Sequence, residues 1–232
     1  MFFQLLPSQQ VFNKVPPGLD GQFVHNKEEL FKGNKAGVNR FFPKDTFFDY
    51  LVPHNFGEWN IDTEAEFICD MHQWFGESPI NGRFIPISEN FKSLLVSFNL
   101  YATRFYPAKV LFKGVKHNYF LLQILIDSIV DKINYKKTYF NNLSSTRKLR
   151  QSSKVIKKFN SFGEMKLYQK QNWKFNWNFE NLVISKSLGE LDLFYVPKLG
   201  IIVSQRLKSE IQNQKLSGVK FREIPFSIEY SD

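Results

Sequence analysis

KLGIIVSQRLKSEIQNQKLSGVKFREIP, the stretch from Lys198 to Pro225, contains the signals for a strand, a capped helix and a second strand. Ile201 to Val203 is a β-branched run, which favours an extended backbone. Ser204 follows this run, and its hydroxyl can accept a hydrogen bond from an amide of the first helical turn. Leu207 and Ile211 recur at helical spacing, with charged residues on the other faces. The stretch therefore predicts a helix that begins at Ser204 and covers a buried surface.

The end of this helix is also marked in the sequence. Ser217 and Gly218 should stop it, because glycine tolerates the left-handed conformation that closes many helices. Apolar and basic residues then alternate from Val219 to Ile224, and Pro225 ends the run. Such alternation predicts a half-buried strand. The unit consists of packing and capping residues, and none of them is a candidate catalytic residue.

A similar unit is expected upstream. Phe84 to Ile87 is a short extended run, and Ser88 should cap a helix that continues to about Phe98. The two helices share the pattern S-x-x-[FL]-K-S-x-[LI], which begins at Ser88 and again at Ser204. Two interpretations stay open: a duplicated motif, or two helices that meet the same capping requirement.

The pattern V-S-Q-R-L-K-x-x-I-x-x-x-x-L-S-G-V-K-F, Val203 to Phe221, resembles the C-terminal signature of a group of bacterial immunity proteins, the DUF1629-like immunity families 11 and 43. F-I-P-I-S-E-N-F-K, which starts at Phe84, and R-F-Y-P-A-K-V, which starts at Arg104, add to the resemblance. Such proteins are encoded beside polymorphic, contact-dependent or type VI secreted toxins. The resemblance implies a bacterial cytoplasmic protein that binds and neutralises a cognate toxin in a tight protein–protein complex. It brings no catalytic residues.

Length and composition favour a globular protein. The chain has 232 residues, of which 43% are hydrophobic and 26 are Phe, so it can bury a sizeable core. We expect a single domain over 1–232, or two packed halves of about 1–80 and 81–232. No apolar run approaches the ~20 residues that cross a bilayer, and the Met1–Pro7 run lacks the basic start of a signal peptide. A single cysteine, Cys69, excludes an internal disulfide, and we expect a cytoplasmic protein.

Charge is distributed unevenly along the chain, whose net charge is +9. Eight acids and no Lys or Arg lie between Asp45 and Gly82. Twelve bases and one acid, Glu164, lie between Lys132 and Lys174. The chain is therefore expected to present two oppositely charged surfaces.

The acidic stretch predicts a helix over 61–75, which Thr63 and the glutamate three residues later would cap. Carboxylates separated by four residues would form one ridge of this helix, with a further acid just before it: Glu58, Asp62, Glu66 and Asp70. Two interpretations stay open. The ridge is a solvated helix face, or it docks into a basic cleft of a partner, with the carboxylates in the place of substrate phosphates.

The basic stretch has its least globular part between residues 141 and 160. Its candidate partner-binding residues are Lys148, Arg150, Lys154, Lys157 and Lys158. A mobile loop or solvated helix is one interpretation. The other is a phosphate-binding arm, so the alternative function is a nucleic-acid-binding module that uses the bases of 132–174.

The middle of the chain should be mostly extended. An antiparallel hairpin is predicted from two extended runs, Lys109 to Phe112 and Tyr119 to Ile126, with Gly114 between them. Its second strand should be central and buried. Ile129 to Tyr139 suggests one further strand. With helices near 62–75, 88–98 and 204–214, the predicted class is α+β, with antiparallel-rich sheets and a few flanking helices.

Catalytic motifs are missing from the sequence. No nucleophile elbow, phosphate-binding loop or H-E-x-x-H occurs, and the histidines are scattered. Cys69 and His72, one helical turn apart, are the one local pair that resembles a thiol and its base, and a buried thiol is usually inert. We expect no enzyme activity, no metal and no cofactor. The expected partner is a toxin protein rather than a membrane, and the sequence predicts no oligomeric state.

Overall fold

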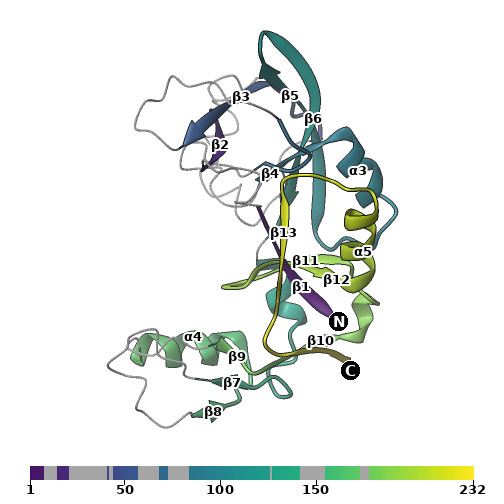
Figure 1. Ribbon diagram of the computed structural model, residues 1–232. Coiled ribbons are helices and arrows are strands. Elements are labelled where there is room, and N and C mark those ends of the chain that lie inside the picture. The colour runs from purple at the N-terminus through teal and green to yellow at the C-terminus, as the bar shows by residue number, and fades with distance from the viewer. Residues whose placement is uncertain are drawn as a thin grey trace.

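The computed structural model of the protein describes residues 1–7, 15–20, 41, 44–56, 68–72, 84–125, 127–141, 155–172 and 178–232 (Figure 1). Within these residues lie three α-helices and four β-sheets, in which most neighbouring strands are antiparallel. The predicted α+β class, with antiparallel-rich sheets and a few flanking helices, is confirmed.

Two sheets form the upper and middle parts of the molecule as Figure 1 is drawn. The five-stranded sheet has the order β2 (Val15–Asp20), β3 (Phe48–Phe56), β5 (Thr103–Phe112), β6 (Val115–Ile124) and β4 (Phe84–Ser88). The four-stranded sheet has the order β11 (Leu193–Val196), β12 (Gly200–Ser204), β1 (Phe2–Pro7) and β13 (Val219–Glu223). Of the neighbouring pairs in these two sheets, β3 and β5 alone run parallel.

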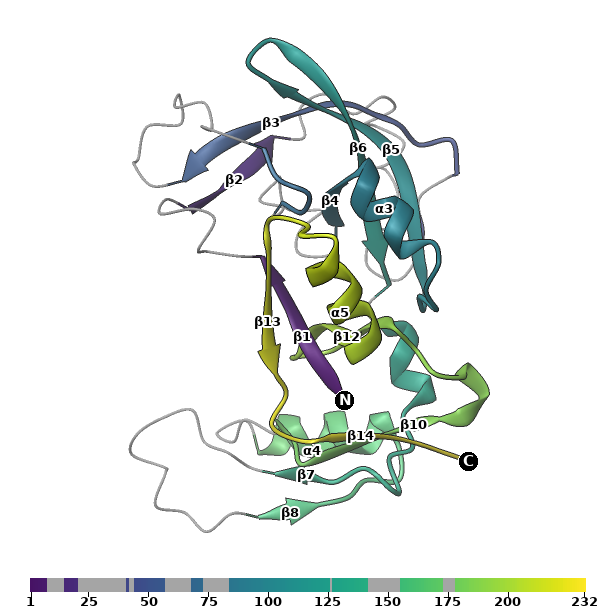
Figure 2. The ribbon, with the colours of Figure 1, turned by 45° about the vertical axis from the view of Figure 1, so that its right-hand side comes forward.

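Smaller elements form the lower part of the molecule (Figure 2). β10 (Asn181–Ser185) pairs in parallel with β14 (Ser227–Ser231). β7 (Phe140–Asn141) lies between β8 (Ile156–Lys157) and β9 (Asn178–Phe179), and α4 (Phe162–Gln171) accompanies them. We call β7, β8, β9 and α4 the lower lobe. Two 3-10 helices, η2 (Asp127–Lys132) and η4 (Lys186–Leu188), complete the described elements.

The strands, the helix start and the buried stripe of the C-terminal unit are as its sequence predicts. α5 (Gln205–Asn213) begins after Ser204, whose hydroxyl accepts a hydrogen bond from the Leu207 amide at 3.1 Å. Leu207 and Ile211 are fully buried, and both belong to an apolar cluster shared with β1, β4 and β6. The predicted stop at Ser217 and Gly218 is wrong: α5 ends at Asn213, and Lys215, with a φ of +51°, is the left-handed residue that closes it. Gly218, with a φ of +82°, lies in the turn that leads into β13.

The upstream unit repeats this arrangement. α3 (Glu89–Leu95) begins after Ser88, whose hydroxyl accepts a hydrogen bond from the Phe91 amide. In each unit the helix contacts the strand before it and the next strand of that sheet: α3 contacts β4 and β6, and α5 contacts β12 and β1. The sheet order also agrees, since the bridge at Met71 followed by β4-β6-β5 matches β11-β12-β1-β13. Equal capping requirements explain neither sheet order nor helix placement, so the structure favours a duplicated unit.

The two units exchange hydrogen bonds through a pair of aspartates. Asp70 accepts a hydrogen bond from the Ser88 hydroxyl of its own unit and from the Ser217 amide, which follows the helix of the other unit. Asp192 accepts one from the Ser204 hydroxyl of its own unit at 2.7 Å and from the amide of Asn99, which follows α3, at 2.9 Å. Each aspartate therefore fixes the start of one helix and the chain after the other.

The predicted hairpin is confirmed. β5 and β6 pair antiparallel over their full length, and Gly114 lies in the turn between them. Leu121, Leu122 and Ile124 are buried, and β6 has a strand on each side. Its one buried polar side chain, Gln123, accepts a hydrogen bond from the Tyr106 hydroxyl at 2.9 Å.

The strand predicted over 129–139 is wrong. This segment starts within η2 and continues as a turn, because its polar side chains and amides bond locally and to β10. The Asn134 amide donates to the Val183 carbonyl at 2.8 Å, and the Val183 amide donates to the Thr138 hydroxyl at 3.0 Å. The apolar residues of the segment still reach the core: Ile129 is fully buried and Ile133 is nearly so.

Candidate binding surfaces

Three of the nine candidate residues fall within the described part of the chain: Asp70, Lys157 and Lys158. The others lie outside the described residues, namely Glu58, Asp62, Glu66, Lys148, Arg150 and Lys154. The predicted acidic ridge and basic arm are therefore represented by one and two residues respectively.

Asp70 does not lie on a helix. Residues 68–72 have no helical turn, and Met71 forms an antiparallel bridge with Ile87 of β4. The predicted helix over 61–75 is thus wrong for 68–72, and its remaining residues lie outside the described part. Backbone hydrogen bonds to two other segments keep residues 68–72 from forming a helix. The Met71 amide donates to the Ser217 carbonyl, and the His72 amide donates to the Pro86 carbonyl at 2.9 Å.

The carboxylate of Asp70 is occupied by structural hydrogen bonds. The hydroxyls of Ser88 and Ser217 each donate to it at 2.7 Å, and the Ser217 amide donates at 2.8 Å. Burial opposes ionisation of this carboxyl most strongly, but the hydrogen bonds from Ser217 and Ser88 outweigh it and lower its pKa below the ordinary value. The charged carboxylate of Asp70 therefore joins segments of the fold through hydrogen bonds. Its position in the sequence had instead predicted a residue of a ridge that docks onto a partner.

Cys69 and His72 do come together, in a buried pocket of the fold. The thiol lies 3.7 Å from His72 Nδ1 and donates to the Met71 carbonyl at 3.0 Å, and the Cys69 amide donates to His72 Nε2 at 3.2 Å. Burial raises the pKa of the thiol to about 12 and lowers the pKa of the imidazole to about 4. A protonated thiol beside a neutral imidazole lacks the thiolate that nucleophilic chemistry needs, so this pair serves packing.

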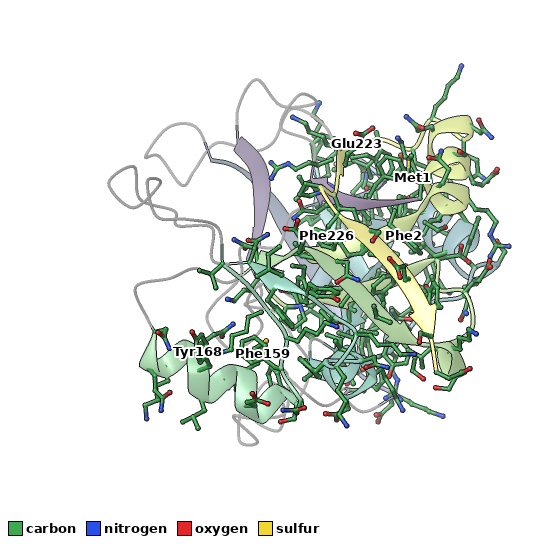
Figure 3. All side chains as sticks on the ribbon, turned by 90° about the horizontal axis from the view of Figure 1, so that it is seen from below. Met1, Phe2, Phe159, Tyr168, Glu223 and Phe226 are labelled. Atoms are coloured by element: carbon green, nitrogen blue, oxygen red, sulfur yellow. The ribbon has the colours of Figure 1, made fainter. Side chains whose placement is uncertain are left out.

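Lys157 ends β8 in the lower lobe and Lys158 follows it directly, and each ammonium group covers an aromatic ring. Lys157 Nζ lies 3.4 Å from the centre of the Tyr168 ring, and Lys158 Nζ lies 4.1 Å from that of Tyr139. Tyr168 in turn contacts Phe159, with ring centres 5.6 Å apart (Figure 3). The described end of the predicted basic arm thus contains a two-residue strand, and both of its candidate lysines make cation–π contacts.

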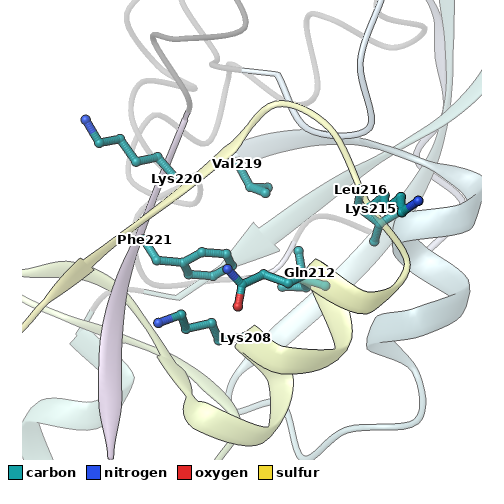
Figure 4. A pocket seen from close by; sticks show the side chains of 8 residues that line it. Lys208, Gln212, Lys215, Leu216, Val219, Lys220 and Phe221 are labelled. Atoms are coloured by element: carbon teal, nitrogen blue, oxygen red, sulfur yellow. The ribbon is translucent and has the colours of Figure 1, made fainter.

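A groove that the sequence interpretation did not single out lies between α5 and β13 (Figure 4). We call it the α5–β13 groove; its volume is about 520 Å³, and it is open to solvent. Its apolar lining comes from Ile211, Leu216, Val219 and Phe221, and its polar lining from Lys208, Gln212, Lys215 and Lys220. The alternation of bases and apolar residues after Gly218 was the available signal, and it was used for strand assignment alone.

A second cavity, of about 210 Å³, lies beneath α4. Tyr135, Phe140, Phe162 and Phe179 give it an aromatic wall, and Lys166 lies at its lining. Ring contacts continue through this wall: Tyr135 and Phe140 stack at 6.2 Å between ring centres. The cavity is smaller than the ~300–1,000 Å³ of ordinary small-molecule sites, so we assign it to incomplete packing beneath α4.

Across the described residues, no three His, Cys, Asp or Glu side chains are placed to hold a metal ion together. Nor does any helix within those ranges have the length and apolar character to cross a membrane. A comparison with models of known protein families and with curated proteins finds no match.

Proposed function

We propose that this protein is an immunity protein, which binds and neutralises a cognate secreted antibacterial toxin by forming a tight protein–protein complex in the cytoplasm. The observation that carries the proposal is a contrast between buried and exposed polar groups of the described residues. The buried pair that resembles a thiol and its base, Cys69 and His72, is held in structural hydrogen bonds, whereas an open groove with a basic rim faces solvent. Inhibition by binding needs a rigid complementary surface and no reaction.

The resemblance to immunity families supports the proposal from a second direction. Its signature, Val203 to Phe221, covers the end of β12, all of α5 and the first three of the five residues of β13. Every residue that lines the α5–β13 groove lies within this signature. Six of the eight groove residues stand at specified positions of the signature, and Gln212 and Lys215 stand at unspecified ones.

Co-expression tests the proposal directly. The product of the neighbouring reading frame should stop growth when expressed alone, and this protein should restore growth and co-purify with it. The variant Leu167→Ala, on the exposed face of α4, should restore growth as well as the unsubstituted protein does. Rescue without a complex, or a complex without rescue, would contradict neutralisation by binding.

Nucleic-acid binding is the alternative, favoured by the lysines and aromatic rings of the lower lobe. A binder of this kind releases counterions, so its affinity falls steeply with salt. We expect only non-specific binding of labelled oligonucleotides, about 10⁻⁴–10⁻⁶ M at physiological salt. Tight, sequence-dependent binding in that titration would overturn the immunity proposal.

A further inference from the structure

The outer edge of β13 is bare in the described part of the chain. β13 is the last strand of its sheet and pairs with β1 on one side (Figure 2). No described strand pairs with its other side, where backbone amides and carbonyls of an edge strand point outward. Such an edge is a template on which an extended segment can add as a further strand.

The duplicated unit shows what the same position can hold. β5 corresponds to β13, since each follows the capped helix of its unit and lies beside the strand that the helix covers. In the upstream unit the outer edge of β5 is occupied by β3, which runs parallel to it with Phe48 opposite Ala108 and Leu51 opposite Val110. Among the described strands, the sheet of the downstream unit therefore ends at β13, whereas its counterpart continues beyond β5 with β3 and β2.

The groove beside this edge determines which side chains a segment paired with β13 would need. Lys208, Lys215 and Lys220 line it, and no carboxylate of a described residue does. Lys208 Nζ lies 3.6 Å from the centre of the Phe3 ring, which holds the ammonium group at the groove. Phe221 and Val219 form an apolar floor between these charges. A strand added here would place alternate, apolar side chains on this floor and the intervening carboxylates on the opposite face of the sheet, beside Lys220.

We infer that the β13 edge and the α5–β13 groove bind an extended acidic segment of a partner protein, which adds alongside β13 as β3 adds alongside β5. The inference rests on the proposed function, because it names the surface by which the toxin is held. A second copy of this chain is a poor occupant, since pairing two β13 edges would bring Lys220 and Arg222 of both copies together. A nucleic acid would meet the lysines but would leave the strand edge unpaired.

Model peptides test the surface without the toxin. The probe is a labelled eight-residue peptide that alternates valine and glutamate, titrated by fluorescence anisotropy. Two matched peptides serve as controls: one with lysine in place of glutamate, and one with alternate backbone amides N-methylated so that one edge can no longer pair. We expect the acidic peptide to bind, and both controls to bind at least about tenfold more weakly.

Protein variants locate the binding. The triple variant Lys208→Glu, Lys215→Glu, Lys220→Glu should weaken peptide binding at least about tenfold, whereas the same change at Lys157, Lys158 and Lys166 in the lower lobe should not. Circular dichroism should show both variants folded; if the first is unfolded, the exposed single change Lys220→Glu replaces it. The inference is overturned if the acidic peptide does not bind, if the N-methylated peptide binds equally, if an oligonucleotide displaces it, or if sedimentation shows a dimer that Lys220→Glu dissolves.

The same variants separate this inference from the proposed function. If the toxin still forms its complex with the triple groove variant, the groove assignment fails and neutralisation by binding stands. If the unsubstituted protein binds the acidic peptide at the groove but forms no complex with the toxin, the proposed function fails and the surface assignment stands. Loss of the toxin complex in the groove variant, with retention in the lower-lobe variant, supports both.

Discussion

At the scale of single residues, two aspartates join parts of the chain that are far apart in sequence. Asp192 is nearly buried, with 3% of its surface exposed, and it forms an ion pair with Arg206 besides its bonds to Ser204 and Asn99. Burial opposes its ionisation, but these donors outweigh that effect, and its pKa lies below the ordinary value. Both aspartates are therefore charged acceptors, and charge-assisted hydrogen bonds are the stronger kind.

The buried imidazole of His72 should make stability depend on pH. Burial lowers its folded-state pKa from 6.5 to about 4, so the unfolded chain takes up the proton first as pH falls. Stability is complete above about pH 6.5 and is lost as pH falls through the range down to about 4, by at most about 3 kcal/mol. Urea denaturation at a series of pH values measures this loss. His72→Gln should flatten the profile in that range; an unchanged slope in the variant would show that another group is responsible.

Gly218 occupies a position that admits no other residue. Its φ is +82°, and a Cβ there would lie 2.1 Å from the Met71 carbonyl oxygen, which is backbone and cannot turn aside. Gly218→Ala should cost about 1–2 kcal/mol for the left-handed conformation and about 1–3 kcal/mol more for the overlap. Gly114→Ala is the matched control, because Gly114 has a φ of +76° but nothing within 4 Å of the added Cβ. Equal losses in denaturant midpoint for the two variants would refute the contact with Met71.

At the scale of elements, helix caps and apolar stripes were predictable because their signals are local. Ser88 and Ser204 each begin a helix, and the buried spacing of Leu207 and Ile211 follows from one turn of that helix. The helix assigned around Asp70 failed at 68–72 for a reason that lies elsewhere in the chain. The Asp70 carboxylate accepts a hydrogen bond from the amide of Ser217, 147 residues away, and no local sequence pattern indicates that contact.

The stripe of α5 should carry a large share of local stability. Leu207 is fully buried in the cluster between the two units, so Leu207→Ala should destabilise by about 2–5 kcal/mol. Leu167→Ala on α4 is the matched control: its side chain is 59% exposed, and the change should stay within about 0.5 kcal/mol. Chemical denaturation followed by circular dichroism compares the two. A small loss for Leu207→Ala would mean that the surrounding cluster closes over the missing atoms.

At the scale of the whole molecule, the sequence predicted the fold class but not the arrangement of its units. The two S-x-x-[FL]-K-S patterns hinted at a duplication, yet the third strand of the downstream unit is β1, which the N-terminal residues supply. That pairing joins Leu5 to Ile201 and to Phe221, and nothing in the local sequence of Phe2–Pro7 announces it. The groove could not be predicted for the same reason, since it forms only where α5 and β13 come together.

The exchange of hydrogen bonds between units should make them unfold together. Asp192→Asn puts an amide where the Asn99 amide now donates, so it should disturb α3 of the upstream unit as well as α5 of its own. Hydrogen exchange read by mass spectrometry should then show faster exchange, by similar factors, in peptides from β6 and from β12. Asp45→Asn, at an exposed turn, is the matched control and should change neither. Faster exchange in β12 alone would mean that the downstream unit opens independently and that the paired aspartates do not couple the halves.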